Sequence, residues 1–108
     1  MKLWLDDERV APEGFIWVKT VDAFDRFLKD GTTIDEVSLD NDLGANQIDG
    51  YHAITRYLAK KLDGVNCNIK SFEFHTKNII AREKMKSLVN SGKKAGIIDQ
   101  NVPMKIVY

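Results

Sequence analysis

The chain has 108 residues, 44% of them hydrophobic and 30% charged, which is the composition of one ordinary globular domain with one core. Its 16 Lys and Arg residues balance its 16 Asp and Glu residues, so it lacks the basic surplus that a general nucleic-acid or membrane-surface binder needs. The single cysteine, Cys67, excludes an intrachain disulfide and a cysteine-based zinc site. No apolar run approaches membrane-spanning length, and we expect the protein in the cytoplasm.

Predicted strands and helices alternate along one domain, residues 1–108. Short runs rich in aromatic and β-branched residues predict five strands, and apolar residues at helical spacing predict three helices. In chain order we expect a strand at 2–6, a strand at 15–19, a helix capped by Thr20 and ended by Gly31, a strand at 36–40, a helix from Asp49 to about Gly64, a strand at 69–75, a helix from about Asn78 to Gly92 and a strand at 104–107. The alternation predicts an α/β fold with a mostly parallel five-stranded sheet in the order 2-1-3-4-5.

The spacing of these elements predicts helices on only one face of the sheet. About eight residues separate the first two strands, whereas a crossover helix needs a dozen or more, and no helix is expected after the last strand. In the 2-1-3-4-5 order both missing helices would cover the same face. The third strand agrees, because Val37 and Leu39 point one way while Ser38 and Asp40 point the other. A second subunit could cover this polar face, or side chains from elsewhere in the chain could do so: Trp4, Trp17, Ile97 and Ile98.

Acidic residues follow two of the predicted strands. Asp6 and Asp7 end the first strand, Asp40 ends the third, and Asp42 comes shortly after it. Ligands of open α/β sheets bind outside the carboxyl ends of the strands, so these carboxylates are expected to share one pocket. Like charges held close raise each other's pKa unless a cation lies between them, and hard oxygen ligands suit Mg²⁺ or Mn²⁺. All four are therefore candidate metal ligands; the alternative is that they cap the turns that follow.

His75 ends the fourth strand on the same face as Asp40. Histidine titrates near neutral pH, and nearby carboxylates are expected to raise its pKa. The candidate catalytic residues are therefore Asp40 and His75, with the histidine protonating a leaving oxygen or activating water. The alternative is an ordinary exposed histidine on the polar face.

Four residues are candidates for binding a phosphate or another part of the substrate. Thr76 and Asn78 lie where a helix N-terminus presents free backbone N–H groups. Arg82 lies one turn further on, and Arg9 follows the first acidic cluster; either guanidinium could hold a phosphate. Helix capping and surface ion pairs are the competing explanations.

Several motifs resemble one known family. The acids after the first strand, Asp40 and the later Asp49-Gly50 resemble a response-regulator receiver domain. More closely, four stretches within about the first ninety residues resemble the cyclic-phosphate processing receiver domain: Leu3-Trp4-Leu5-Asp6-Asp7-Glu8-Arg9, Trp17-Val18-Lys19-Thr20, Leu39-Asp40-Asn41-Asp42-Leu43-Gly44, and Phe74-His75-Thr76 with Asn78 and Arg82.

The resemblance implies a receiver-like, flavodoxin-like fold and a metal-dependent or acid/base pocket that acts on cyclic phosphates of nucleotides or RNA ends, as in RNA repair. Two departures leave alternatives open. Asn41 stands where the family usually has a histidine, and Lys105 lies near the beginning of the last strand, whereas receivers carry a lysine at its end. The alternatives are a non-catalytic signalling module that forms a homodimer or binds a partner through the less covered face, and a true receiver phosphorylated on Asp40.

Overall fold

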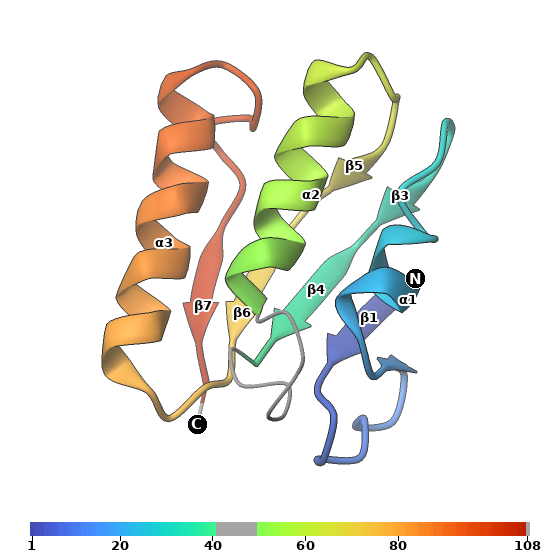
Figure 1. Cartoon of the computed structure of the whole chain (residues 1–108), viewed down its shortest axis with the longest axis vertical. Coiled ribbons are helices and arrows are strands. Elements are labelled where there is room, and N and C mark those ends of the chain that lie inside the picture. Colours follow the sequence, from blue (N-terminus) through green and yellow to red (C-terminus); the bar gives the residue numbers. More distant parts are fainter. Residues whose placement is uncertain (41–49, 108) are drawn as a thin grey trace.

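The protein is described by a computed structural model that covers residues 1–40 and 50–107. Its main sheet has five parallel strands in the spatial order β2-β1-β4-β6-β7 (Figure 1). These strands are β2 (Ile16–Val18), β1 (Lys2–Leu5), β4 (Glu36–Leu39), β6 (Phe72–Phe74) and β7 (Met104–Ile106). Numbered among themselves along the chain, they have the order 2-1-3-4-5, which confirms the predicted receiver-like topology.

All three helices of the described ranges lie on one face of this sheet, as predicted (Figure 1). They are α1 (Val21–Asp25), α2 (Gly50–Leu62) and α3 (Ile79–Lys94). Their buried residues recur at helical spacing and pack on the strand residues that point toward them, forming one core. In the described ranges no helix combines the length and the apolarity needed to cross a membrane.

The segment after α1 departs from the prediction. The helix begins where expected, because the Thr20 side chain accepts a hydrogen bond from the backbone N–H of Ala23 at 3.0 Å. It ends at Asp25 instead of near Gly31, since Phe27 and Leu28 donate backbone hydrogen bonds to residues three positions earlier, which tightens the chain. Both side chains still pack on the core. The apolar residues therefore continue to pack on the core after the regular helix has ended.

The strand expected at 69–75 is divided between two sheets. Its first part, β5 (Asn68–Ile69), pairs with β3 (Thr33–Ile34) in a separate two-stranded parallel sheet. Its second part, β6, pairs with β4. The chain changes partner between these parts, with Lys70 donating to the carbonyl of Ile34 and Ser71 accepting from the amide of Val37. The apolar pattern continues through both parts, which is why it predicted one strand.

The opposite face of the main sheet is largely polar. Trp4, Ser38, Glu73 and Lys105 lie in register across β1, β4, β6 and β7, and no helix of the described part of the chain packs on them. Trp4 is nevertheless buried, because the segment between β1 and β2 brings Phe15 edge-on against its ring at 5.8 Å. The prediction for Ile98 was wrong: its side chain packs beside α3 on the helical face.

The first residue of α2 requires glycine because it lies against the end of β4. A Cβ atom at Gly50 would collide with the backbone carbonyl oxygen of Asp40 and lie 3.3 Å from the sulfur of Met85. This close approach holds the backbone at the end of β4 against the start of α2.

We expect Gly50→Ala to lower the free energy of unfolding by about 1–3 kcal/mol, because the added methyl group must displace backbone. Gly92→Ala is the matched control, since the atoms nearest to its Cβ would belong to the side chains of Leu58 and Ile98 and not to the backbone. Urea unfolding of both variants measures the difference. Equal unfolding midpoints would contradict the proposed close-packing requirement at Gly50.

Candidate functional site

Three ligand-type side chains meet at the carboxyl ends of the central strands. Asp6 follows β1, Asp40 follows β4 and His75 follows β6, and these strands are neighbours in the sheet. One oxygen or nitrogen atom of each side chain lies within 4.8 Å of the corresponding atoms of the other two. This edge is where ligands bind in open α/β sheets. The fold thus brings together acids from two strands and the histidine of a third.

His75 is the centre of a buried hydrogen-bond chain. Its Nε2 lies 2.9 Å from Oδ2 of Asp6, and its Nδ1 lies 2.8 Å from the hydroxyl oxygen of Ser38. All three side chains are buried, and the indole of Trp4 stacks on the imidazole with 3.8 Å between ring centroids and 6° between planes. A carboxylate can only accept, so Nε2–H donates to Asp6 and, in the neutral ring, Nδ1 accepts from the Ser38 hydroxyl.

Burial lowers the pKa of His75 below its ordinary value of 6.5. The hydrogen bond and negative charge of Asp6 act in the opposite direction, and the positive charge of Arg9 adds to the lowering. The expectation that the carboxylates raise this pKa was therefore wrong, because the cost of charging an imidazole without water outweighs them. The ring is neutral at neutral pH, in agreement with the assigned tautomer.

Asp6 is only 1% exposed, and both of its carboxylate oxygens have hydrogen-bond partners within the protein. Its Oδ1 accepts from the backbone N–H groups of Glu8 at 2.8 Å and Arg9 at 2.9 Å, so it caps the turn after β1. Its Oδ2 faces His75 and lies 3.7 Å from Nε of Arg9. The indole N–H of Trp17 donates to the Asp6 carbonyl at 2.7 Å. The capping role weighed from the sequence is present here, combined with the contact to His75.

A pocket of about 310 Å³ opens beside Asp6 and Asp40. It is lined by residues from three loops at the carboxyl edge of the sheet: Asp6, Asp7, Glu8, Arg9, Asp40, Thr76, Lys77 and Asn78. Asp7 and Asp40 are half-buried, whereas Arg9, Lys77 and Asn78 are exposed. The pocket lining therefore combines carboxylates, two cationic side chains and a helix N-terminus.

The N-terminus of α3 forms one wall of this pocket. The Asn78 side chain accepts from the backbone N–H of Ala81 at 3.1 Å, and the Thr76 hydroxyl accepts from that of Asn78 at 3.2 Å. Capping thus explains both side chains. The first amides of a helix have no intrahelical acceptors, and the dipole makes this end positive, so the wall can bind an anion.

Six of the candidate site residues line the pocket, namely Asp6, Asp7, Arg9, Asp40, Thr76 and Asn78. His75 lies behind Asp6 and does not line it, and Arg82 on α3 lies outside the lining. Asp42 lies outside the described residues, as does Asn41.

Three residues of the candidate site were not predicted from the sequence. Ser38 lies on the face of β4 that carries Asp40, and that alternation was the available signal for it. Trp4 was expected only to shield the polar face, whereas it stacks on His75. Lys77 stands between Thr76 and Asn78, so its position was the clue to its presence in the pocket.

We expect stability to depend on the protonation of His75. Because its pKa is lowered in the folded protein, the unfolded chain binds this proton more readily. The free energy of unfolding should therefore fall as the pH drops below about 6.5, by at most about 1.4 kcal/mol per pH unit.

Urea unfolding at several pH values without divalent cations measures this dependence, and NMR titration of the imidazole signals assigns it. The exposed His52 provides the control, since His52→Gln should leave the dependence unchanged. A His75 signal that titrates at or above 6.5 would contradict the role given to burial.

The comparison with protein families agrees with this geometry. Residues 1–91 match the family described as the cyclic-phosphate processing receiver domain. The matched range includes all three strand ends of the site and most of α3. Comparisons with curated proteins and with solved structures find no match. Because the family match extends over most of its length, the chain belongs to the cyclic-phosphate processing receiver domain family.

Proposed function

We propose that the pocket beside Asp6 and Asp40 binds a cyclic phosphate of a nucleotide or RNA end and, with a divalent cation, hydrolyses it. The observation that carries this proposal is the convergence of Asp6, Asp40 and His75, whose ligand atoms lie within 4.8 Å of one another. The pocket beside them is also lined by the cationic side chains of Arg9 and Lys77. Carboxylates suit a metal ion, while Arg9, Lys77 and the α3 N-terminus suit a phosphate. Membership in the family supports the same substrate class.

The donor set fits Mg²⁺ or Mn²⁺. Asp6, Asp7 and Asp40 all line the pocket and offer carboxylate oxygens, which these hard cations prefer. The Nε2–H of His75 is directed at Asp6, so the histidine would orient the carboxylate that binds the metal ion. When bound, the cation would neutralise charge on the phosphate oxygens and lower the pKa of a coordinated water.

The reaction opens the phosphate ring by adding water. The water oxygen bonds to phosphorus, one of the two ring P–O bonds breaks, and the product is a phosphomonoester with a free hydroxyl group. Asp40, half-buried at the pocket wall, accepts the proton of the water, and the leaving oxygen takes a proton from solvent. Arg9 and Lys77 hold the phosphate charge that develops.

His75 acts in this scheme as a positioning residue for Asp6. Both ring nitrogens have partners, and the ring is fully buried beneath Trp4. This role differs from the direct proton transfer expected from the sequence.

Replacing Asp40 by Asn should reduce hydrolysis of a nucleoside 2′,3′-cyclic phosphate in Mg²⁺ or Mn²⁺ by about 10²–10⁴-fold, because the base is lost. Asp63→Asn is the control, since Asp63 is exposed just beyond the far end of α2. Chromatography of the phosphomonoester product measures the rates.

If the wild type hydrolyses no cyclic phosphate with either cation, the enzymatic proposal is wrong. The non-catalytic module then becomes the better account, with the polar sheet face around Glu73 and Lys105 as the surface for the expected homodimer or partner. Phosphorylation of Asp40 is less well supported, because Lys105 lies beside Glu73 and does not line the pocket.

His75→Phe should retain stacking on Trp4 but leave Asp6 without its buried donor. We expect metal affinity to fall about 10–100-fold, because the hydrogen bond that orients the ligand is lost. Calorimetric titration with Mn²⁺ measures this affinity, and His52→Gln again serves as the control. Unchanged metal affinity with a large loss of kcat would instead support direct proton transfer by His75.

A further inference from the structure

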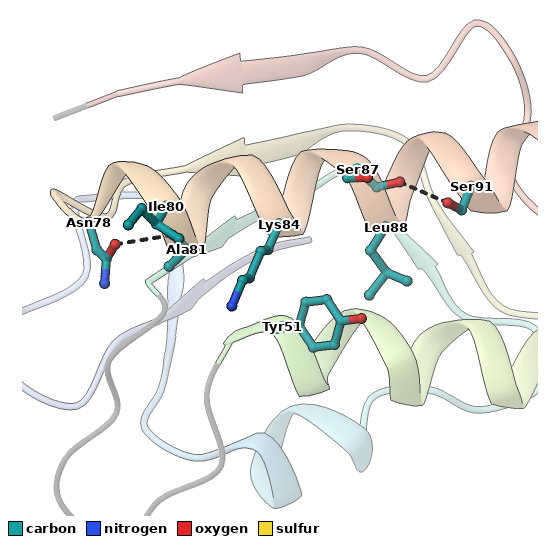
Figure 2. Close-up of a pocket in the computed structure, with 8 residues that line it drawn as sticks. All are labelled: Tyr51, Asn78, Ile80, Ala81, Lys84, Ser87, Leu88 and Ser91. Carbon is teal, nitrogen blue, oxygen red and sulfur yellow. Dashed lines mark hydrogen bonds between the residues drawn. The ribbon is translucent and has the colours of Figure 1, made fainter.

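A groove of about 630 Å³ runs between α2 and α3, separate from the pocket that contains the acids. Figure 2 shows Tyr51 of α2, together with Lys84 and Leu88 of α3, pointing into the space between the two helices. The lining residues on α3 recur at spacings of three and four, so they form one side of the helix. The groove is lined by Tyr51, Asn78, Ile80, Ala81, Lys84, Ser87, Leu88 and Ser91.

The groove and the acidic pocket meet at Asn78. This residue lines both, because it caps α3 at the point where the groove reaches the carboxyl edge of the sheet. Lys84 follows six residues later, about 9 Å along the helix axis. A ligand whose phosphate occupies the pocket can therefore continue along α3 past Ile80 to Lys84.

The two cavities differ in charge. Among the described residues, the pocket lining includes four acidic residues, whereas the groove lining includes no carboxylate and one cationic side chain, Lys84. Within the described ranges Lys84 is exposed and forms no ion pair, while the neighbouring Lys86 pairs with Glu83 at 3.4 Å. The Lys84 ammonium is thus placed to meet an anion that does not enter the acidic pocket.

The groove offers an aliphatic and an aromatic surface among its polar side chains. Ile80 is 71% exposed, and Tyr51 is half-buried. A flat base can pack against such surfaces, and the phosphodiester beyond it would meet Lys84. From the Asn78 end the order along the groove is Ile80, Lys84 and Tyr51 (Figure 2), which matches a base, a phosphate and a further base.

We infer that the groove binds the nucleoside and the adjoining phosphodiester of a substrate whose cyclic phosphate lies in the acidic pocket. The substrate class is then an oligonucleotide ending in a cyclic phosphate, instead of a free cyclic mononucleotide. This inference rests on the proposed function of the pocket. Ile80 contacts the base of the terminal nucleoside, Lys84 pairs with the second phosphate, and Tyr51 contacts the base beyond that phosphate.

The test compares two probes in the presence of Mg²⁺: a nucleoside 2′,3′-cyclic phosphorothioate and a dinucleotide ending in the same group. NMR titration of the backbone amides gives both affinities. The dinucleotide should bind roughly tenfold more tightly, because one further base packs on the protein. Its binding should also shift the amide signals of Tyr51 and Lys84.

Lys84→Ala should weaken dinucleotide binding, lower its salt dependence by about 0.7 in log–log slope, and leave mononucleotide binding unchanged. Lys86→Ala is the matched control on the same helix and should alter neither affinity. Equal affinities of the two probes, or equal effects of the two lysine variants, would overturn the inference while leaving the pocket proposal intact. Failure of both probes to bind would overturn both.

Discussion

The hydrogen bonds of the buried His75 ring connect the three central strands of the sheet at the candidate site. The ring accepts from Ser38 on β4, donates to Asp6 after β1, and itself follows β6. All three side chains are buried, so the imidazole depends on Ser38 and Asp6 for its hydrogen bonds. Breaking one bond would leave a buried polar group unsatisfied, which typically costs about 1–3 kcal/mol.

The same interaction connects stability with function. Trp4 excludes water from the ring of His75, and this burial keeps the histidine neutral beside an acid. A neutral donor orients the Asp6 carboxylate without cancelling its charge, which is what the proposed cation site requires. Asp40 is supported differently, by the close approach of Gly50 to its backbone carbonyl. The rigid sheet edge therefore presents both acids from well-packed positions.

The polar sheet face is less open than its sequence pattern suggests. The helices of the described ranges cover only the other face (Figure 1), yet the segment between β1 and β2 brings Phe15 against Trp4 on this one. That segment contributes Phe15 to the shielding of Trp4 and Arg9 to the pocket wall. A connection too short for a crossover helix thus helps to bury the histidine and also supplies a phosphate-binding candidate.

The sequence by itself determined the strand order and the edge at which the acids meet. Strand alternation and short connections depend on local spacing, and the caps at Thr20 and Asn78 depend on neighbouring residues. Only the tertiary structure decided the environment of His75, because its burial is produced by Trp4 and Ser38 from distant segments. Desolvation by those contacts reversed the expected direction of its pKa shift. No local pattern contains that information, since burial is a property of the assembled core.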